Sequence, residues 1–384
     1  MWKRGVEFLC CLQCGKSLEL FTIEDRDIPL SNEDKVLAGK RGLEFSAISR
    51  FIETGILFCP DCKVWHPVVY GLPIMLPYAT NTVKDFEKRN INYIKKLGKG
   101  YSYPQGTPAP GEMRVLKSFT REWLEYPYDE VLWSWSYDQR EAIFLGEIGV
   151  KHPERESLNF LEIGCGLGVV TSFGAKHLKG DAIGVDLSGA VARSARHFQN
   201  NPFLHFIQAS LWNLPLKQSS FDMVYSHGAL HHTYSTKKAF QTIARFCKPG
   251  GYCYIWIYGS KSINENTGRK LAYGLEAILR PVLSRVPSGI CNIFLYPLSF
   301  AYVVITNLQK IFRLRHKAYT LRRGLHAARD RFTPLFAHRT QAEQARSWFE
   351  KEGFEEIKEI SLSNLPPEAH GAFRRNVGIR GQKI

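Results

Sequence analysis

The sequence contains no internal repeat and no low-complexity tract in its 384 residues, which excludes repeat and low-complexity classes of protein. It also lacks the apolar core of a secretory signal, because the run Phe8–Leu12 is too short and charged residues soon follow. The nine cysteines are odd in number, which argues against a disulfide scaffold. These absences predict a cytoplasmic globular protein, and the length predicts two or three domains.

Positive charge is concentrated in one part of the chain, whose formal net charge is +15. Residues 1–80 contain nine Lys/Arg and ten Asp/Glu, a net charge of −1. Residues 261–331 contain thirteen Lys/Arg and three Asp/Glu, a net charge of +10. This segment therefore predicts a polyanionic partner: nucleic acid, an anionic membrane surface or an acidic substrate.

From residue 157 onward, strand-like apolar runs alternate with helix-like segments. Strands are expected at 159–163, 182–185, 205–208, 221–226 and 252–257, and helices at 169–178, 189–199 and 237–247. The alternation predicts βαβ units and hence a doubly wound α/β domain with a mostly parallel sheet. We expect this domain to span 119–384, separated from an N-terminal domain at 1–80 by a polar linker at 81–118.

A glycine-rich segment, Leu161-Glu-Ile-Gly-Cys-Gly-Leu-Gly168, follows the first strand of this domain and opens a helix. Glycines there let the backbone approach a ligand, and the helix N-terminus supplies N–H donors. Asp186 follows 22 residues after Gly164, at the end of the next strand. A carboxylate at that place can accept both ribose hydroxyls of a nucleoside. These residues alone leave NAD and S-adenosylmethionine both open.

Three further features accompany the glycine segment: Glu162 two residues before Gly164, Phe221-Asp222 at the start of a strand, and the turn Lys248-Pro-Gly-Gly251. In this order, residues 157–258 resemble class I S-adenosylmethionine-dependent methyltransferases of the small-molecule, Methyltransf_11-like branch. The resemblance returns weakly at 332–360, with a late helix at 344–354 and a late strand at 355–360. It implies a Rossmann-like methyltransferase sheet and S-adenosyl-L-methionine as cofactor.

The resemblance also implies a role for each residue around the cofactor. Glu162 would orient the loop and the cationic end of the cofactor, Gly164, Cys165, Gly166 and Gly168 would pass close to its methionine part, Asp186 would bind the ribose, and Leu187, Ser210 and Leu211 would contact the adenine. Many relatives have an acid at the position of Ser210. The hydroxyl found here is a weaker partner for the adenine amino group.

The segment Ser226-His-Gly-Ala-Leu-His-His-Thr233 follows the fourth strand, where a doubly wound sheet binds its ligands. Methyl transfer needs chiefly an aligned acceptor, and sometimes a base that removes its proton. Histidine titrates near neutral pH, so His227, His231 and His232 are candidate catalytic bases, with His227 first. Alternatively, His231 and His232 only begin a helix and pack against the cofactor.

Two CxxC motifs, Cys11-Leu-Gln-Cys14 and Cys59-Pro-Asp-Cys62, could supply four thiolates to a tetrahedral structural Zn²⁺. Cys10 is an extra candidate ligand. With the following His66–Pro77 segment, the motifs resemble the Trm112-like zinc ribbon, which bacteria fuse to or pair with methyltransferases, although the long insert at 20–55 departs from that pattern. A redox pair or a ribbon that has lost its metal stays open.

The basic segment 261–331 lies between the fifth strand and the late helix. Apolar residues from Leu271 to Val286 recur at helical spacing, and the 24 residues Val286–Gln309 contain no charge. That run has the length of a transmembrane helix, but one crossing would separate the late helix and strand from their sheet. We therefore expect a monotopic patch on an anionic membrane. The alternatives are a helical lid or a homodimer contact, with nucleic acid less favoured.

The leading hypothesis is a cytoplasmic enzyme, peripheral at the inner membrane face, that methylates an oxygen, nitrogen or carbon atom of a small apolar or lipid-linked metabolite. The second hypothesis is an rRNA or tRNA methyltransferase that binds through the zinc ribbon and the basic insert. The sequence has no Asn-Pro-Pro-Tyr-type motif for a flipped base, which disfavours it. A non-enzymatic binding partner is disfavoured by the intact glycine segment and Asp186.

Overall fold

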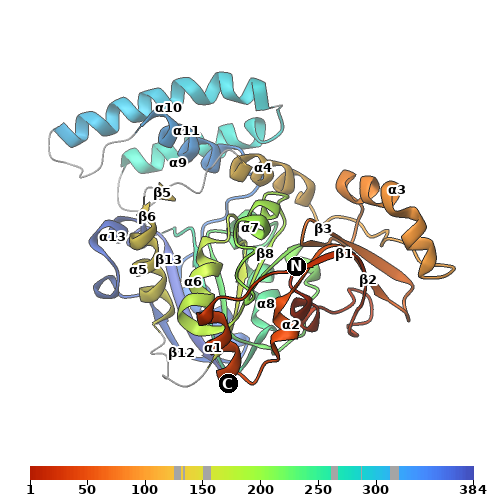
Figure 1. Ribbon diagram of the computed structural model, residues 1–384. Coiled ribbons are helices and arrows are strands. Elements are labelled where there is room, and N and C mark those ends of the chain that lie inside the picture. The colour runs from red at the N-terminus through yellow and green to blue at the C-terminus, as the bar shows by residue number, and fades with distance from the viewer. Residues whose placement is uncertain (125–130, 133–134, 150–156, 261–266, 287, 312–319) are drawn as a thin grey trace.

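The computed structural model describes residues 1–124, 131–132, 135–149, 157–260, 267–286, 288–311 and 320–384, and Figure 1 shows their arrangement. The strands are β1 (Glu19–Asp27), β2 (Arg50–Cys59), β3 (Val64–Val69), β4 (Leu72–Met75), β5 (Val131–Leu132), β6 (Trp135–Ser136), β7 (Leu158–Ile163), β8 (Lys179–Asp186), β9 (Leu204–Ala209), β10 (Phe221–His227), β11 (Cys247–Ile257), β12 (Phe354–Glu359) and β13 (Val377–Lys383). The α-helices are α1 (Asn32–Lys40), α2 (Phe45–Ser49), α3 (Asn81–Lys96), α4 (Glu112–Leu124), α5 (Tyr137–Ile148), α6 (Val169–Leu178), α7 (Val191–His197), α8 (Thr236–Ala244), α9 (Thr267–Leu283), α10 (Ser288–Ile311), α11 (Leu321–Phe332), α12 (Ala342–Lys351) and α13 (Pro367–Phe373). Short 3₁₀ turns lie at Lys3–Phe8, Leu211–Asn213, Leu230–His232 and Leu362–Asn364.

One large sheet organises the described residues, in the strand order β1-β2-β3-β4-β9-β8-β7-β10-β11-β13-β12. Strands β9, β8, β7, β10 and β11 are parallel to one another, and β13 pairs antiparallel with β11 and β12. The predicted doubly wound α/β class is therefore confirmed. The strand order reverses between β7 and β10, and in such sheets the crevice for ligands lies outside the carboxyl ends of the strands at that point.

Helices cover both faces of the sheet, so its central strands are buried on both sides. Neighbouring residues point to opposite faces: Phe160 packs in the cluster with α5 and α6, whereas Leu161 packs in the cluster with α8 and α12. The two helices of each pair contact each other as well as the sheet. This two-sided burial explains why the central strands read as continuous apolar runs in the sequence.

The N-terminal segment is joined to this sheet. Strand β4 pairs in parallel with β9, with Ile74 opposite Gln208 and Met75 opposite Ala209. The sequence predicted a small domain at 1–80 but gave no sign of this pairing. The stretch 81–118, expected to be a linker, contains α3 and the start of α4. Helix α3 forms because Val83, Phe86 and Ile94 lie on one buried face of an otherwise polar segment.

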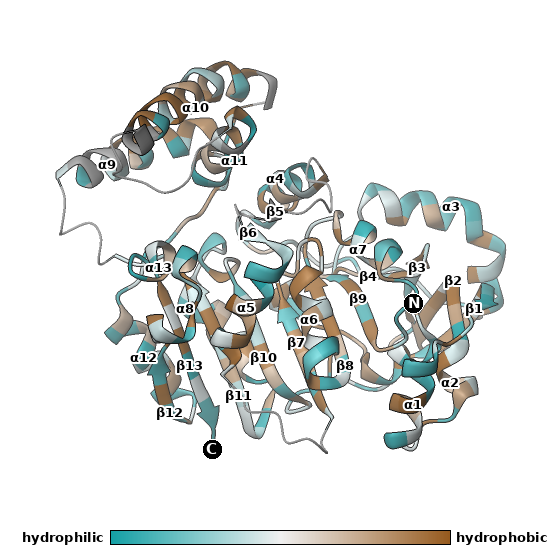
Figure 2. Cartoon of the chain, turned by 60° about the vertical axis from the view of Figure 1, so that its left-hand side comes forward, coloured by the Kyte–Doolittle hydropathy of each residue, from teal (hydrophilic) through white to brown (hydrophobic). Residues whose placement is uncertain are grey.

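Helices α9, α10 and α11 form a separate layer beside the carboxyl ends of the strands (Figure 2). They share a small core of their own, made of Leu283, Cys291, Leu295 and Phe332. The parts of the predicted insert at 261–266, 287 and 312–319 lie outside the described residues. None of the helices in the described ranges is long and apolar enough to cross a membrane.

Candidate functional site

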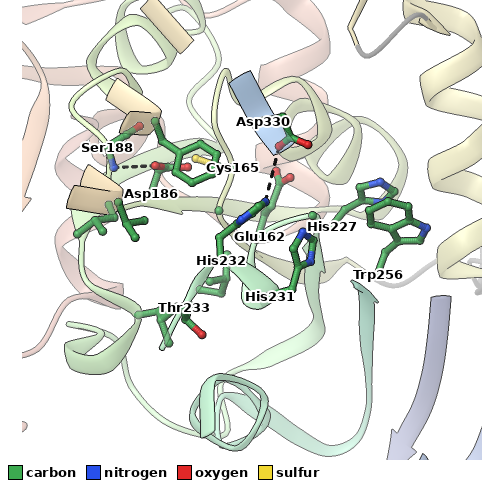
Figure 3. A pocket seen from close by; sticks show the side chains of 18 of the residues that line it. Glu162, Cys165, Asp186, Ser188, His227, His231, His232, Thr233, Trp256 and Asp330 are labelled. Carbon is green, nitrogen blue, oxygen red and sulfur yellow. Dashed lines mark hydrogen bonds and ion pairs between the residues drawn. The ribbon is translucent and has the colours of Figure 1, made fainter. Parts of the chain in front are cut away.

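A cavity of about 450 Å³ lies at the carboxyl ends of β7, β8, β9, β10 and β11. Residues of the glycine segment line it together with the segment after β10, helix α4, the end of α11 and helix α13. Figure 3 shows Asp186 and Ser188 on one side and His227, His231 and Trp256 on the other. One cavity thus brings together the sequence regions that were expected to bind a cofactor and to perform chemistry.

The glycine loop between β7 and α6 is held against the end of β8. Gly164, Gly166 and Gly168 all have positive φ, at 77°, 52° and 73°. The two oxygens of the Asp186 carboxylate accept the backbone amides of Gly166 and Ser188, each at 2.7 Å. Burial raises the pKa of this carboxyl, whereas both amide hydrogen bonds lower it. The Ser188 hydroxyl is buried without a hydrogen-bond partner among the described residues and also faces the cavity.

Glu162 lies at the bottom of the cavity, 4% exposed. Its carboxyl accepts a hydrogen bond from the Thr171 hydroxyl at 2.5 Å. Burial raises the pKa of Glu162 to about 8, although the Thr171 hydrogen bond and the charge of Arg140 lower it in part. In the ligand-free protein this group therefore holds its proton near neutral pH, and a bound cation would favour its ionised form.

The predicted cofactor residues fall into two groups. Those that line the cavity are Glu162, Gly164, Cys165, Asp186, Leu187 and Leu211. Gly166, Gly168 and Ser210 lie behind this lining; the Ser210 hydroxyl accepts the amide of Trp212 at 3.2 Å. Glu112 of α4 also lines the cavity, although the sequence did not indicate it. Burial raises the pKa of the Glu112 carboxyl, and a hydrogen bond with Ser210 lowers it in part.

The side chain of His227 is held by a buried carboxylate and by a stacked aromatic ring. Its Nδ1 lies 2.7 Å from Oε1 of Glu147, a residue of α5 whose side chain is fully buried. Its ring stacks on Trp256 with centroids 4.5 Å apart and planes 3° apart. Burial lowers the pKa of His227, although the Glu147 charge raises it in part, so the imidazole is neutral at physiological pH.

His231 and His232 form a short 3₁₀ turn and contact the segment that follows α11. Nδ1 of His232 lies 2.8 Å from the carbonyl oxygen of Phe336, and its Nε2 lies 3.7 Å from Asp330 of α11. His231 stacks on Tyr258, whose hydroxyl donates a hydrogen bond to Asp330. Asp330 of the insert and Phe336, which lies just after it, both line the cavity, so the end of the insert and the segment that follows close one side of it.

The four predicted metal ligands meet at one place. The sulfur atoms of Cys11, Cys14, Cys59 and Cys62 all lie within 4.8 Å of one another. Cys11 and Cys14 precede β1, and Cys59 and Cys62 lie at the turn between β2 and β3. Cys10, the extra candidate, is buried and is not a member of this group. Four converging thiols are the donor set that structural Zn²⁺ prefers.

Sequence analysis missed Glu147, Glu112 and Asp330. Three partners of Glu147 lie 78, 80 and 107 residues further along the chain, and the fourth, Arg140, lies seven residues earlier on the same helix, so no familiar motif marks the group. One signal was present: Glu147 is a charged residue within the apolar helical segment Ala142–Ile148. Charged residues are almost never fully buried unless they are paired, so such a residue predicts a buried partner.

Comparison with known proteins identifies the central segment. Residues 161–255 match the model of the methyltransferase domain family Methyltransf_11. The chain is 30% identical over 132 residues to an uncharacterized protein of a Synechococcus species, covering 33% of this chain and 30% of that protein. It is 26% identical to the sterol 24-C-methyltransferase of Pneumocystis carinii, covering 32% and 34%, and 26% identical to a phthiotriol/phenolphthiotriol dimycocerosates methyltransferase of Mycobacterium ulcerans, covering 40% and 66%.

The matches cover only part of each relative: 30%, 34% and 44% of the length of the first three. Among solved structures, a methyltransferase of Thermotoga maritima described as a possible histamine N-methyltransferase is 21% identical, with a TM-score of 0.40, over 70% of this chain and all of that one. That overlap is too loose to bear on function. The family match is thus confined to residues 161–255.

We expect Glu162→Gln to change how stability depends on pH. The folded-state pKa of Glu162, about 8, lies above its unfolded value, so the folded protein binds more protons between about pH 4.5 and 8. This group therefore lowers the free energy of unfolding as pH rises through that window. In the ligand-free protein, the melting temperature should fall less between pH 6 and pH 8 for Glu162→Gln than for the wild type. Glu355 is exposed, so Glu355→Gln should behave as the wild type. A melting temperature that falls as much in Glu162→Gln as in the wild type would contradict the raised pKa of Glu162.

Proposed function

We propose that this chain transfers the methyl group of S-adenosylmethionine to a small apolar or lipid-linked acceptor at an anionic membrane surface. The observation that carries the proposal is the single cavity that runs from Asp186 and the glycine loop to His227 and Trp256. One end suits a nucleoside, and the other end offers a neutral imidazole among aromatic side chains.

Three features of the cavity fit the cofactor. The buried Ser188 hydroxyl, which has no hydrogen-bond partner among the described residues, and the Asp186 carboxylate can bind hydroxyl groups of the ribose. Glu162 can ionise beside a sulfonium cation. The glycine loop supplies backbone rather than a side chain at this wall: Gly164 lines the cavity, and its φ of 77° lies in the left-handed region that favours glycine. When bound, the cofactor supplies an activated methyl group, and the chain aligns the acceptor with it.

Asp186→Asn should weaken binding of S-adenosylmethionine by roughly ten- to a hundredfold, the value of one or two hydrogen bonds to a charged group. Isothermal titration calorimetry measures this directly and needs no acceptor. Asp222→Asn is the matched control: Asp222 is also mostly buried and accepts a backbone amide, from Asn159 at 2.8 Å, but does not line the cavity. Equal affinity in Asp186→Asn and the wild type would remove the nucleoside assignment.

The acceptor is inferred from the relatives and from the surface of the insert. The two named methyltransferase relatives are described as acting on a sterol and on phthiotriol-type lipids. Helix α10 exposes a row of large apolar side chains, at Ile290, Ile293, Phe294, Tyr296, Phe300, Val304, Ile305 and Leu308. Together with the basic residues of 261–331, this face suits an anionic membrane, because apolar groups enter the interface while Lys and Arg contact headgroups.

Anionic vesicles of phosphatidylglycerol and phosphatidylcholine should retain the wild-type protein in a sedimentation assay, and pure phosphatidylcholine should retain less. The double variant Ile293→Glu, Phe300→Glu should lose at least tenfold in retention, because each side chain is more than 60% exposed and burying it contributes about 1.5–3 kcal/mol. Val36→Glu, at an exposed apolar position on α1, is the control. Retention of the double variant at the wild-type level would exclude this face as the membrane contact.

The acceptor class can be tested with a tritiated methyl donor. Label should enter the solvent-extractable lipid of a total cell extract that is incubated with the protein and the donor. Label in RNA instead, together with RNA binding that weakens steeply with salt, would favour the RNA methyltransferase hypothesis.

We also propose that Cys11, Cys14, Cys59 and Cys62 hold one structural Zn²⁺ and that the surrounding segment 1–80 is a stabilising platform. The ion would join the two ends of the β1–β2 hairpin. Metal binding of this kind contributes directly to folding stability.

Cys59→Ser should reduce the zinc content from about one ion per chain to nearly none and should lower the melting temperature. Elemental analysis by mass spectrometry and thermal unfolding measure the two effects. Cys10→Ser is the control, because Cys10 is a buried neighbour outside the four-sulfur group. A wild-type protein that is free of metal after expression with zinc, and equally stable with a chelator, would refute the zinc site.

A further inference from the structure

Glu147, the next-to-last residue of α5, accepts four hydrogen bonds at a fully buried carboxylate. Oε1 accepts from the hydroxyl of Tyr254 at 2.9 Å and from Nδ1 of His227 at 2.7 Å. Oε2 accepts from the hydroxyl of Tyr225 at 2.5 Å and from the guanidinium of Arg140 at 3.1 Å. The carboxylate itself does not line the cavity. It reaches the cavity through two of its partners, His227 and Arg140, which both line it.

The protonation of this cluster follows from its charges. Burial raises the pKa of the Glu147 carboxyl, but Arg140 and His227 lower it more, to about 2. Glu147 is therefore ionised and can only accept hydrogen bonds. A neutral His227 must then carry its proton on Nδ1, since that nitrogen faces the carboxylate. The Nε2 atom of His227 keeps a free lone pair.

The ring of His227 is also fixed in orientation. It lies at the carboxyl end of β10 and stacks on Trp256 of β11, and it lines the cavity. No residue in the described ranges hydrogen bonds to its Nε2. The two other histidines differ. His231 has no hydrogen-bond partner on either ring nitrogen among the described residues, and Nδ1 of His232 is engaged by the Phe336 carbonyl.

We propose that Glu147 is a positioning residue that holds His227 as the general base for a protic acceptor, a hydroxyl or an amine. The inference rests on the proposed function. In the transfer step, Nε2 takes the acceptor's proton and the acceptor atom forms a bond to the methyl carbon. The methyl–sulfur bond breaks, and its electron pair stays on sulfur. The negative charge of Glu147 stabilises the imidazolium that results.

The ring tautomer can be observed in protein labelled with ¹⁵N-histidine. In the ligand-free wild type, the His227 resonances, assigned by their loss in His227→Gln, should show a protonated Nδ1 and an unprotonated Nε2. Glu147→Gln should give a mixture of tautomers. Because the Glu147 charge raises the pKa of His227, the variant should also titrate at lower pH. Tyr254→Phe, which removes a different donor to the same oxygen, should keep the wild-type tautomer.

Two measurements on Glu147→Gln, kcat and the affinity for S-adenosylmethionine, distinguish a misplaced His227 from a protein that has lost its fold. With the lipid fraction that accepts tritium, kcat of Glu147→Gln should fall by roughly 10²-fold, the lower range for loss of a general base, with the acid limb of its pH profile moved to lower pH. Its affinity for S-adenosylmethionine should stay within about twofold of wild type. A wild-type His227 protonated on Nε2 would overturn the proposal even if Glu147→Gln does not fold, and so would an unchanged rate in Glu147→Gln.

Failure of the proposed function gives a different result. In that case the wild type binds no S-adenosylmethionine, or labels no lipid, while the tautomer of His227 is still read from the ligand-free protein.

Discussion

The backbone amide of Gly166 donates a hydrogen bond to the carboxylate of Asp186, and the rest of the site depends on this contact. It holds the loop that follows β7 against the end of β8, together with the amides of Gly164 and Cys165, which donate to the carbonyl oxygen of Val185. The loop can lie there only because its glycines adopt left-handed φ angles, which side chains disfavour. The cavity that results is lined by the Asp186 carboxylate and by Gly164 and Cys165 of the glycine loop.

The opposite wall is built from distant parts of the chain. Tyr258 follows β11, and Asp330 belongs to α11, yet they are joined by a hydrogen bond at the cavity. The same helical layer presents apolar side chains of α10 to the outside. The insert therefore has two different faces: Asp330 lines the pocket, and the apolar side chains of α10 lie on the outside. A lid and a membrane contact need not exclude each other in this arrangement.

The sequence predicted most of the parallel sheet, because its strands are buried on both faces and read as short apolar runs between glycine turns. Helix α6 was predicted at 169–178 and begins and ends there. The CxxC spacing indicated each pair of cysteines, and the resemblance to a zinc ribbon joined the two pairs, which are separated by 44 residues. The sequence did not place three features. Strand β13 lies after a polar turn, Glu147 is marked only as a charge within an apolar helical segment while three of its four partners lie far along the chain, and the short run Leu72–Met75 gave no indication of which strand it would pair with.

The pairing of β4 with β9 also covers part of the edge that β9 would otherwise present to other chains. All six residues of β9, Leu204–Ala209, are buried, and the strand contains Phe206 and Ile207. A chain shortened to begin after Met75 would leave this strand as a bare apolar border of the sheet. Unpaired backbone groups along such a border bind strands of other copies, and short β-prone segments without charge are the ones that form fibrils. The cysteine-bearing segment thus covers part of that edge, where Ile74 and Met75 pair with Gln208 and Ala209.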